Sequence, residues 1–255
     1  LRGSTDGQRW SANGEVDLDS AIWQGIQLTQ IRGPILMDQS GVRFGAMTVS
    51  DGMTPRRLSA KVAGGKIEVD GMASSSGLGG FSVAASLVDA DLERIACDSR
   101  GTPHRSKGRV FGSAEISGTR TGTHSLRGHG QLRLRDADVY ELPLVVAMLK
   151  MLRVKAPDRS AFGSSFIQFR IAGPHAYLDE IELAGDAISL VGNGEVGFDG
   201  DVQMTFRSIM GDAEEQLPAM KRMLGGASGQ FLLLHVDGSL DSPELSTEAF
   251  PTLAA

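Results

Sequence analysis

Short runs in which apolar and polar residues alternate, each closed by glycine, are the feature that most constrains what this chain can fold into. In GQLRLRD, Leu132 and Leu134 alternate with Arg133 and Arg135. Successive side chains of a β-strand point to opposite faces, so this pattern predicts a strand with one apolar and one polar face. The same pattern recurs in block after block from Trp10 onward. The sequence therefore predicts a mainly β protein with a long antiparallel sheet.

Composition and length agree with this fold class. The 255 residues are 41% hydrophobic and only 5% aromatic, and 33 of them are glycine, which suits many short strands joined by turns. The length fits one large domain or two ordinary ones. Turn-forming and charged residues gather in RGTPHRSK, Arg100 to Lys107. We therefore expect an N-terminal part of the repetitive sheet over 1–102 and a second part over 103–255 that continues the same sheet.

Charge excludes one class of function and leaves another open. Lys and Arg number 25 against 31 Asp and Glu, so the net charge of −6 has the wrong sign for a dedicated nucleic-acid binder. Between Arg100 and Arg135, however, there are eight basic residues and a single acid, Glu115. This stretch is either a solvated outer face or a surface that attracts anionic phosphate head groups. The single cysteine, Cys97, excludes an intrachain disulfide framework and a Cys-rich zinc site.

Three stretches break the alternation and predict short helices, at about 90–96, 142–153 and 212–224. In the second, the uninterrupted apolar run from Leu142 to Leu149 is less than half of a membrane span of about 20 residues. The chain contains no apolar run long enough to cross a bilayer, and it does not begin with Met. We expect it to be an excerpt whose upstream part carries any membrane anchor or export signal.

The second predicted helix is apolar nearly all the way round, so it must be enclosed rather than lie on the surface. We predict that it packs into or across the mouth of the sheet as a plug or end cap, with Lys150 and Arg153 facing out. The residues that would make this plug are Leu142, Val146, Leu149 and Leu152.

Residues with reactive side chains do not form a recognisable catalytic or metal-binding pattern. GNGEVG, Gly192 to Gly197, has the letters of a dinucleotide-binding fingerprint, but a strand and an Asp-Gly turn follow it instead of a helix. We interpret these glycines as turn and bulge residues. The five histidines are scattered without metal-ligand spacing. The Asp136/Asp138 and Asp199/Asp201 pairs adjoin strand ends, where Asp favours turns. We expect no enzyme activity, no metal and no cofactor.

The segment from Gly128 to Phe206 resembles a known family. It contains GHGQLRLRDADVYELPLVVAMLKML, then FGSSFIQFRIAG, then YLDEIELAGDAISLVGNGEVGFDGDVQMTF. In order these are a Gly-x-Gly strand, an acidic turn with a short apolar helix, a strand that contains Phe166 and Phe169, and a strand pair closed by an Asp-Gly hairpin. This order is similar to the C-terminal region of AsmA-like proteins, the bacterial relatives of the bridge-like lipid-transfer proteins that include TamB and YhdP. The part 103–255 would be this region.

The resemblance implies a fold, a location and a role. The fold would be a long curved antiparallel β-sheet that forms a taco-like groove, with two or three short helices packed on it or at its end. The protein would be anchored in the inner membrane of a diderm bacterium by an upstream N-terminal segment, and most of it would lie in the periplasm. It would serve outer-membrane biogenesis by conducting phospholipids along the apolar groove, without catalytic residues or cofactors. Its partners would be phospholipid acyl chains and other envelope proteins.

Alternation alone selects the residues that would line such a groove. They are Val16, Leu18, Ile67, Val69, Val83, Leu87, Leu132, Leu134, Ile167, Phe169, Ile181, Leu183, Ile188, Leu190, Val196, Phe198, Met204 and Phe206. A one-sided sheet of this size must either fold on itself or leave an apolar channel. The alternative to a lipid groove is therefore a non-catalytic structural or scaffold module of the cell envelope, in which the same residues form a dry core. A carbohydrate-active β-solenoid enzyme would require clustered acids, which the sequence does not show.

Overall fold

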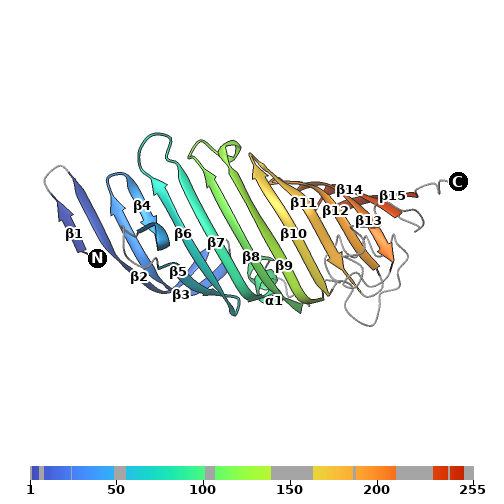
Figure 1. Cartoon of the computed structure of the whole chain (residues 1–255), viewed down its shortest axis with the longest axis horizontal. Coiled ribbons are helices and arrows are strands. Elements are labelled where there is room, and N and C mark those ends of the chain that lie inside the picture. The colour runs from blue at the N-terminus through green and yellow to red at the C-terminus, as the bar shows by residue number, and fades with distance from the viewer. Residues whose placement is uncertain are drawn as a thin grey trace, which may run out of the picture. The chain divides into compact units, whose positions relative to one another are not determined.

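The computed structural model describes residues 2–5, 9–23, 25–48, 56–100, 107–138, 163–185, 188–210, 232–240 and 242–249. Within these residues the chain is built almost wholly of β-strands (Figure 1), which confirms the predicted mainly β class. The strands are β1 (Arg2–Thr5), β2 (Trp10–Trp23), β3 (Ile26–Asp38), β4 (Gly41–Phe44), β5 (Leu58–Val62), β6 (Gly65–Ser74), β7 (Phe81–Asp91), β8 (Lys107–Gly118), β9 (Arg127–Asp138), β10 (Ser164–Ala172), β11 (His175–Ala184), β12 (Ile188–Gly197), β13 (Asp201–Met210), β14 (Leu232–Ser239) and β15 (Ser242–Ala249).

The strands belong to one antiparallel sheet in which sequence neighbours are mostly spatial neighbours. The order runs from β1 to β15, except that β5 lies off this path and pairs with both β3 and β6. By their internal contacts the residues divide into two compact units. Unit 1 comprises Leu1–Pro103, Val110–Gln131 and Ile171–Pro174, and unit 2 comprises His104–Arg109, Leu132–Arg170 and His175–Ala255. The predicted division after residue 102 stays a prediction.

One α-helix, α1 (Leu92–Arg100), lies in the described part of the chain, close to the helical turns predicted at 90–96. The side chain of Asp91 begins it by accepting a hydrogen bond from the Arg94 backbone N–H at 3.2 Å. Two 3-10 helices, η1 (Gly45–Thr48) and η2 (Thr123–Ser125), complete the list. The helices predicted at 142–153 and 212–224, and with them the plug residues Leu142, Val146, Leu149 and Leu152, lie outside the described residues.

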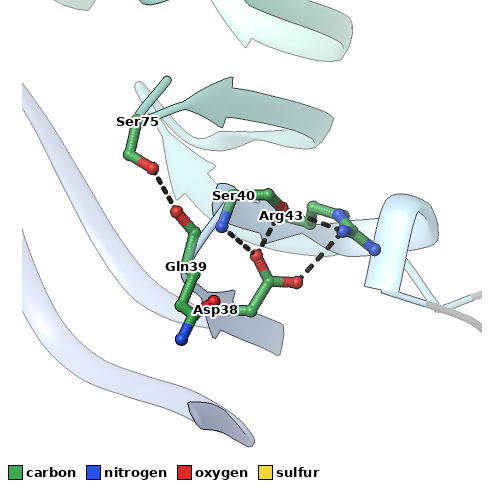
Figure 2. Close-up of polar contacts among 5 residues, drawn as sticks. All are labelled: Asp38, Gln39, Ser40, Arg43 and Ser75. Carbon is green, nitrogen blue, oxygen red and sulfur yellow. Dashed lines mark hydrogen bonds and ion pairs between the residues drawn. The ribbon is translucent and has the colours of Figure 1, made fainter. Parts of the chain in front are cut away.

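The β3–β4 hairpin of unit 1 is fixed by a side-chain network at its turn (Figure 2). The Asp38 carboxylate accepts hydrogen bonds from the backbone N–H of Ser40 at 2.8 Å, from the Ser40 hydroxyl, and from the Arg43 guanidinium at 3.1 Å. These bonds lower the pKa of Asp38, the Ser40 hydroxyl contributing most. The Ser75 hydroxyl in turn donates to the Gln39 carbonyl at 2.5 Å. The hairpin is therefore tied to the loop between β6 and β7.

Candidate functional site

The apolar face of the sheet is the candidate functional site, and in unit 1 the strand register builds it row by row. Directly opposed residues of neighbouring strands share a face. One row runs from β5 through β6 to β7 as Ala60, Ile67 and Leu87, and the next runs as Leu58, Val69 and Ala85. Further rows join β3, β4, β6 and β7, namely Ile35, Phe44, Gly71 and Val83, and then Met37, Val42, Ala73 and Phe81. These rows form one continuous apolar surface.

This surface in unit 1 is only partly covered. Ile31, Ala60 and Val62 are buried, but the predicted lining residues of β6 and β7 are half-buried. On β2, Leu18 lies opposite Ile31 and keeps 49% of its surface exposed. All six predicted lining residues of this unit lie on the apolar face, because the strand register links β2 through β3, β5 and β6 to β7. They are Val16, Leu18, Ile67, Val69, Val83 and Leu87.

The opposite face of unit 1 is mainly polar and carries ion pairs, although Met72 and Val88 are also exposed on it, at 40% and 50%. Arg32 pairs with Asp17 at 3.1 Å, and Lys66 pairs with Glu68 at 2.6 Å. Most of these side chains are exposed, so each pair contributes at most about 1 kcal/mol to the free energy of unfolding. Their main effect is to keep this face solvated.

Asp70 is the exception on the polar face, because it is only 7% exposed. Its carboxylate accepts a hydrogen bond from the backbone N–H of Ala46 at 2.7 Å and pairs with Arg57 Nε at 3.2 Å. Burial of a carboxylate is tolerated only when it is paired and hydrogen-bonded, as here. Asp70 therefore fastens η1 to the middle of β6.

In unit 2 the apolar face of β12, β13 and β14 is closely packed. Register rows across β11, β12, β13 and β14 run as Ile181, Gly192, Phe206 and Leu234, and then as Leu178, Gly194, Met204 and Val236. Phe206 is 1% exposed, and Leu190, Leu234 and Val236 are 0% exposed. Full burial of side chains of this size stabilises a fold by about 1.5–3 kcal/mol each. The apolar side of β12, β13 and β14 is thus more tightly packed than that of β6 and β7 in unit 1.

The glycines of GNGEVG have a different role from the predicted one. Gly192 and Gly194 lie within β12, which pairs with β13 without interruption from Ile188 to Val196, so the turn-and-bulge interpretation is wrong for these two. Gly197 ends β12 and begins the turn, since its carbonyl accepts a hydrogen bond from the Gly200 N–H at 3.0 Å. A Cβ on Gly192 would stand 2.6 Å from Phe206 Cδ1, and a Cβ on Gly194 would stand 2.7 Å from Met204 Cγ. Each Cβ would also stand 2.3 Å from a backbone carbonyl oxygen of β13, that of Thr205 or of Gln203, so both the backbone and the side chains of β13 exclude a side chain here. The bulge lies instead on β11, between Leu178 and Ile181.

The remaining predicted lining residues fall into three groups. Leu132 and Leu134 on β9, and Ile167 and Phe169 on β10, are half-buried and alternate with exposed polar side chains such as Arg133 and Gln168. Ile181, Leu190, Met204 and Phe206 are buried, and Leu183 and Val196 half-buried, on the packed face of unit 2. Phe198 lies in the β12–β13 turn and is 50% exposed, and Ile188 pairs with Met210 but its side chain lies outside the described set.

Part of the basic stretch lies along one face of β9. Arg127, His129, Arg133 and Arg135 alternate along this strand and are exposed. Within unit 2, the Arg133 guanidinium lies 5.4 Å from the centre of the Phe166 ring, a cation–π distance. No group of three or more His, Cys, Asp or Glu side chains in the described ranges is arranged to hold a metal ion. Among the same residues no helix is long and apolar enough to cross a membrane.

Comparison with known proteins adds no relative: no family model, curated protein or solved structure matches the chain.

Proposed function

We propose that this chain is a non-enzymatic protein that carries phospholipids by their acyl chains on the apolar face of unit 1. The observation that supports the proposal is the unbroken set of apolar rows from β3 to β7, most of whose residues are half-buried rather than fully buried. Exposing an acyl chain to water costs about 0.8 kcal/mol per methylene, so a 16-carbon chain meets a barrier of roughly 12 kcal/mol. A partly open apolar face lowers that barrier.

The resemblance to AsmA-like proteins suggests where this activity would be used. We propose a periplasmic location in a diderm bacterium, with anchoring in the inner membrane and transfer of phospholipid toward the outer membrane along a groove. The polar opposite face of unit 1, with its exposed ion pairs, fits a protein that keeps one side of its sheet in water.

A structural module of the envelope is the second candidate, and the closed core of unit 2 favours it. Leu190, Phe206, Leu234 and Val236 are fully shielded from water, as in a domain that only supports its neighbours. The two candidates differ in unit 1. A structural module leaves the half-open face without lipid, whereas a carrier fills it.

Site-specific photocrosslinking separates the candidates. A benzophenone amino acid replaces Val83 on the apolar face of β7, and in a matched variant it replaces Ala84, which is equally half-buried but opposes Asp70 on the polar face. We expect irradiation in cells to attach phospholipid at position 83 and not at position 84, as measured by mass spectrometry of the purified chain. Equal labelling at both positions, or none at position 83 in a variant with unchanged circular dichroism, would refute the proposal.

A further inference from the structure

The polar face of unit 2 carries two straight rows of hydrogen-bonding side chains that the sequence keeps far apart. The first row crosses β11, β12, β13 and β14 as Tyr177, Glu195, Gln203 and Asp237. The second row lies two residues further along β12, β13 and β14 and consists of Asn193, Thr205 and His235. Neighbouring strands are about 4.8 Å apart, so the first row spans roughly 14 Å. We call these seven residues the polar grid.

The polar grid forms the floor of a shallow depression with a volume of about 530 Å³. One wall of the depression is held rigid by a bidentate ion pair, in which Arg170 Nε and Nη2 each lie 2.7 Å from an oxygen of Asp179. The same guanidinium lies 5.5 Å from the centre of the Tyr177 ring. Bidentate pairs of this kind fix both side chains in one geometry. The ring of Tyr177 is therefore positioned at the edge of the grid before any ligand arrives.

Within the grid, Asn193, Glu195 and Gln203 keep much of their hydrogen-bonding capacity. Gln203 Nε2 donates to Asp237 Oδ1 at 3.4 Å, and Thr205 Oγ1 and His235 Nδ1 are 3.3 Å apart, which are long contacts. The side chains of Asn193 and Glu195 make no hydrogen bond to any other residue that the structure describes. Amide groups offer both donors and acceptors, and the carboxylates offer acceptors.

This chemistry selects among ligands. Among the side chains that line the depression, the carboxylates of Glu195, Asp237 and Asp179 outnumber the one guanidinium, that of Arg170, so a phosphate or a nucleic acid would be repelled. A metal ion lacks the required cluster of ligands among the described side chains. A lipid tail would leave the grid unsatisfied. A saccharide, whose hydroxyls both donate and accept and whose ring packs on an aromatic side chain, matches the grid.

We propose that the polar grid binds a saccharide chain laid across strands β11 to β14, with one sugar ring against Tyr177 and hydroxyls on Asn193, Glu195 and Gln203. This inference does not depend on lipid carriage, because the grid lies on β11 to β14 of unit 2, whereas the proposed lipid surface lies on β3 to β7 of unit 1.

The test is a titration of the whole chain, followed by amide chemical shifts, with three probes: tetra-N-acetylchitotetraose, its deacetylated form, and cellotetraose. We expect at least one probe to give saturable shifts centred on β12 and β13. Asn193→Ala and Gln203→Ala should each weaken that binding about three- to ten-fold, since each removes hydrogen bonds to a neutral group. Asn13→Ala is the matched control, because Asn13 is an exposed asparagine on the polar face of β2, and it should leave the affinity unchanged.

Two results would overturn the proposal. One is the absence of saturable shifts with all three probes up to their solubility limits. The other is binding that Asn193→Ala, Gln203→Ala and Asn13→Ala leave equally strong while each variant keeps the wild-type melting temperature.

Discussion

Replacing Gly194 with alanine should destabilise unit 2, although most glycine-to-alanine changes in strands are mild. The backbone of Gly194 is not left-handed, so alanine itself is permitted there and would gain about 0.4–1 kcal/mol through the unfolded chain. The added Cβ, however, would stand 2.3 Å from the carbonyl oxygen of Gln203 and 2.6 Å from the Cα of Met204. Both are backbone atoms of the paired strand β13, which cannot rotate away. Overpacking of this kind costs about 1–3 kcal/mol.

The net expectation for Gly194→Ala is a loss of about 1–2 kcal/mol, which lowers the melting temperature of a chain of this size by about 2–8 °C. Thermal unfolding followed by circular dichroism measures it. Gly80→Ala is the matched control, because the Cβ would meet only the Gly118 carbonyl oxygen at 3.9 Å and the backbone is again not left-handed. Equal melting temperatures for the two variants would show that β12 and β13 have room to separate, and the close-approach explanation of GNGEVG would then fail.

Two further predictions concern charged side chains. Asp70→Ala should lower the free energy of unfolding by about 1–3 kcal/mol in urea titrations, because it leaves the Ala46 N–H without its acceptor and leaves Arg57 with Glu68 as a carboxylate partner but without Asp70. Asp17→Ala, at an exposed pair, should change the free energy of unfolding little. The Arg170 hydrogen bonds lower the pKa of Asp179 below its ordinary value of 3.8, so this pair stabilises the fold above that pH, and its contribution disappears as the pH falls through the lowered pKa. The melting temperature of Asp179→Asn should therefore fall less than that of the wild type between neutral and strongly acidic pH; parallel curves would contradict this.

The face to which each strand residue points could be predicted from the sequence, because it depends only on the residue's position along its own strand. Leu132 and Leu134 alternate with Arg133 and Arg135, and this spacing alone decides that they point to opposite sides. The residues that face each other across strands could not be predicted in the same way. Gly192 opposes Phe206 only because the β12–β13 hairpin sets that register, and a shift of one residue would have placed the phenyl ring elsewhere.

Alternation also does not reveal what covers a face. Val83 and Phe206 both occupy apolar positions in well-alternating strands, yet Val83 is half-buried and Phe206 is 1% exposed. The polar grid was missed for a related reason. Three successive strand pairings bring Tyr177 and Asp237 into one row. Their spacing in the sequence does not indicate that they share it. The pattern of alternating polar residues in β11 to β14 was the only signal, and every exposed strand face carries it.

One packing device is common to both units and bears on the proposed lipid carriage. In unit 1, Phe44 lies over Gly71 of the paired strand, whose Cβ would stand 2.5 Å from the ring, and in unit 2 Phe206 lies over Gly192 in the same way. A ring that lies over a glycine is held close to the backbone of the next strand instead of projecting from the sheet. It therefore adds apolar area without protruding far above the sheet surface. In unit 2 this permits tight packing. In unit 1, where the face is half-open, an acyl chain could then pass Phe44 without any side chain changing its rotamer. Gly71 is therefore as much a part of the proposed path as the apolar residues beside it.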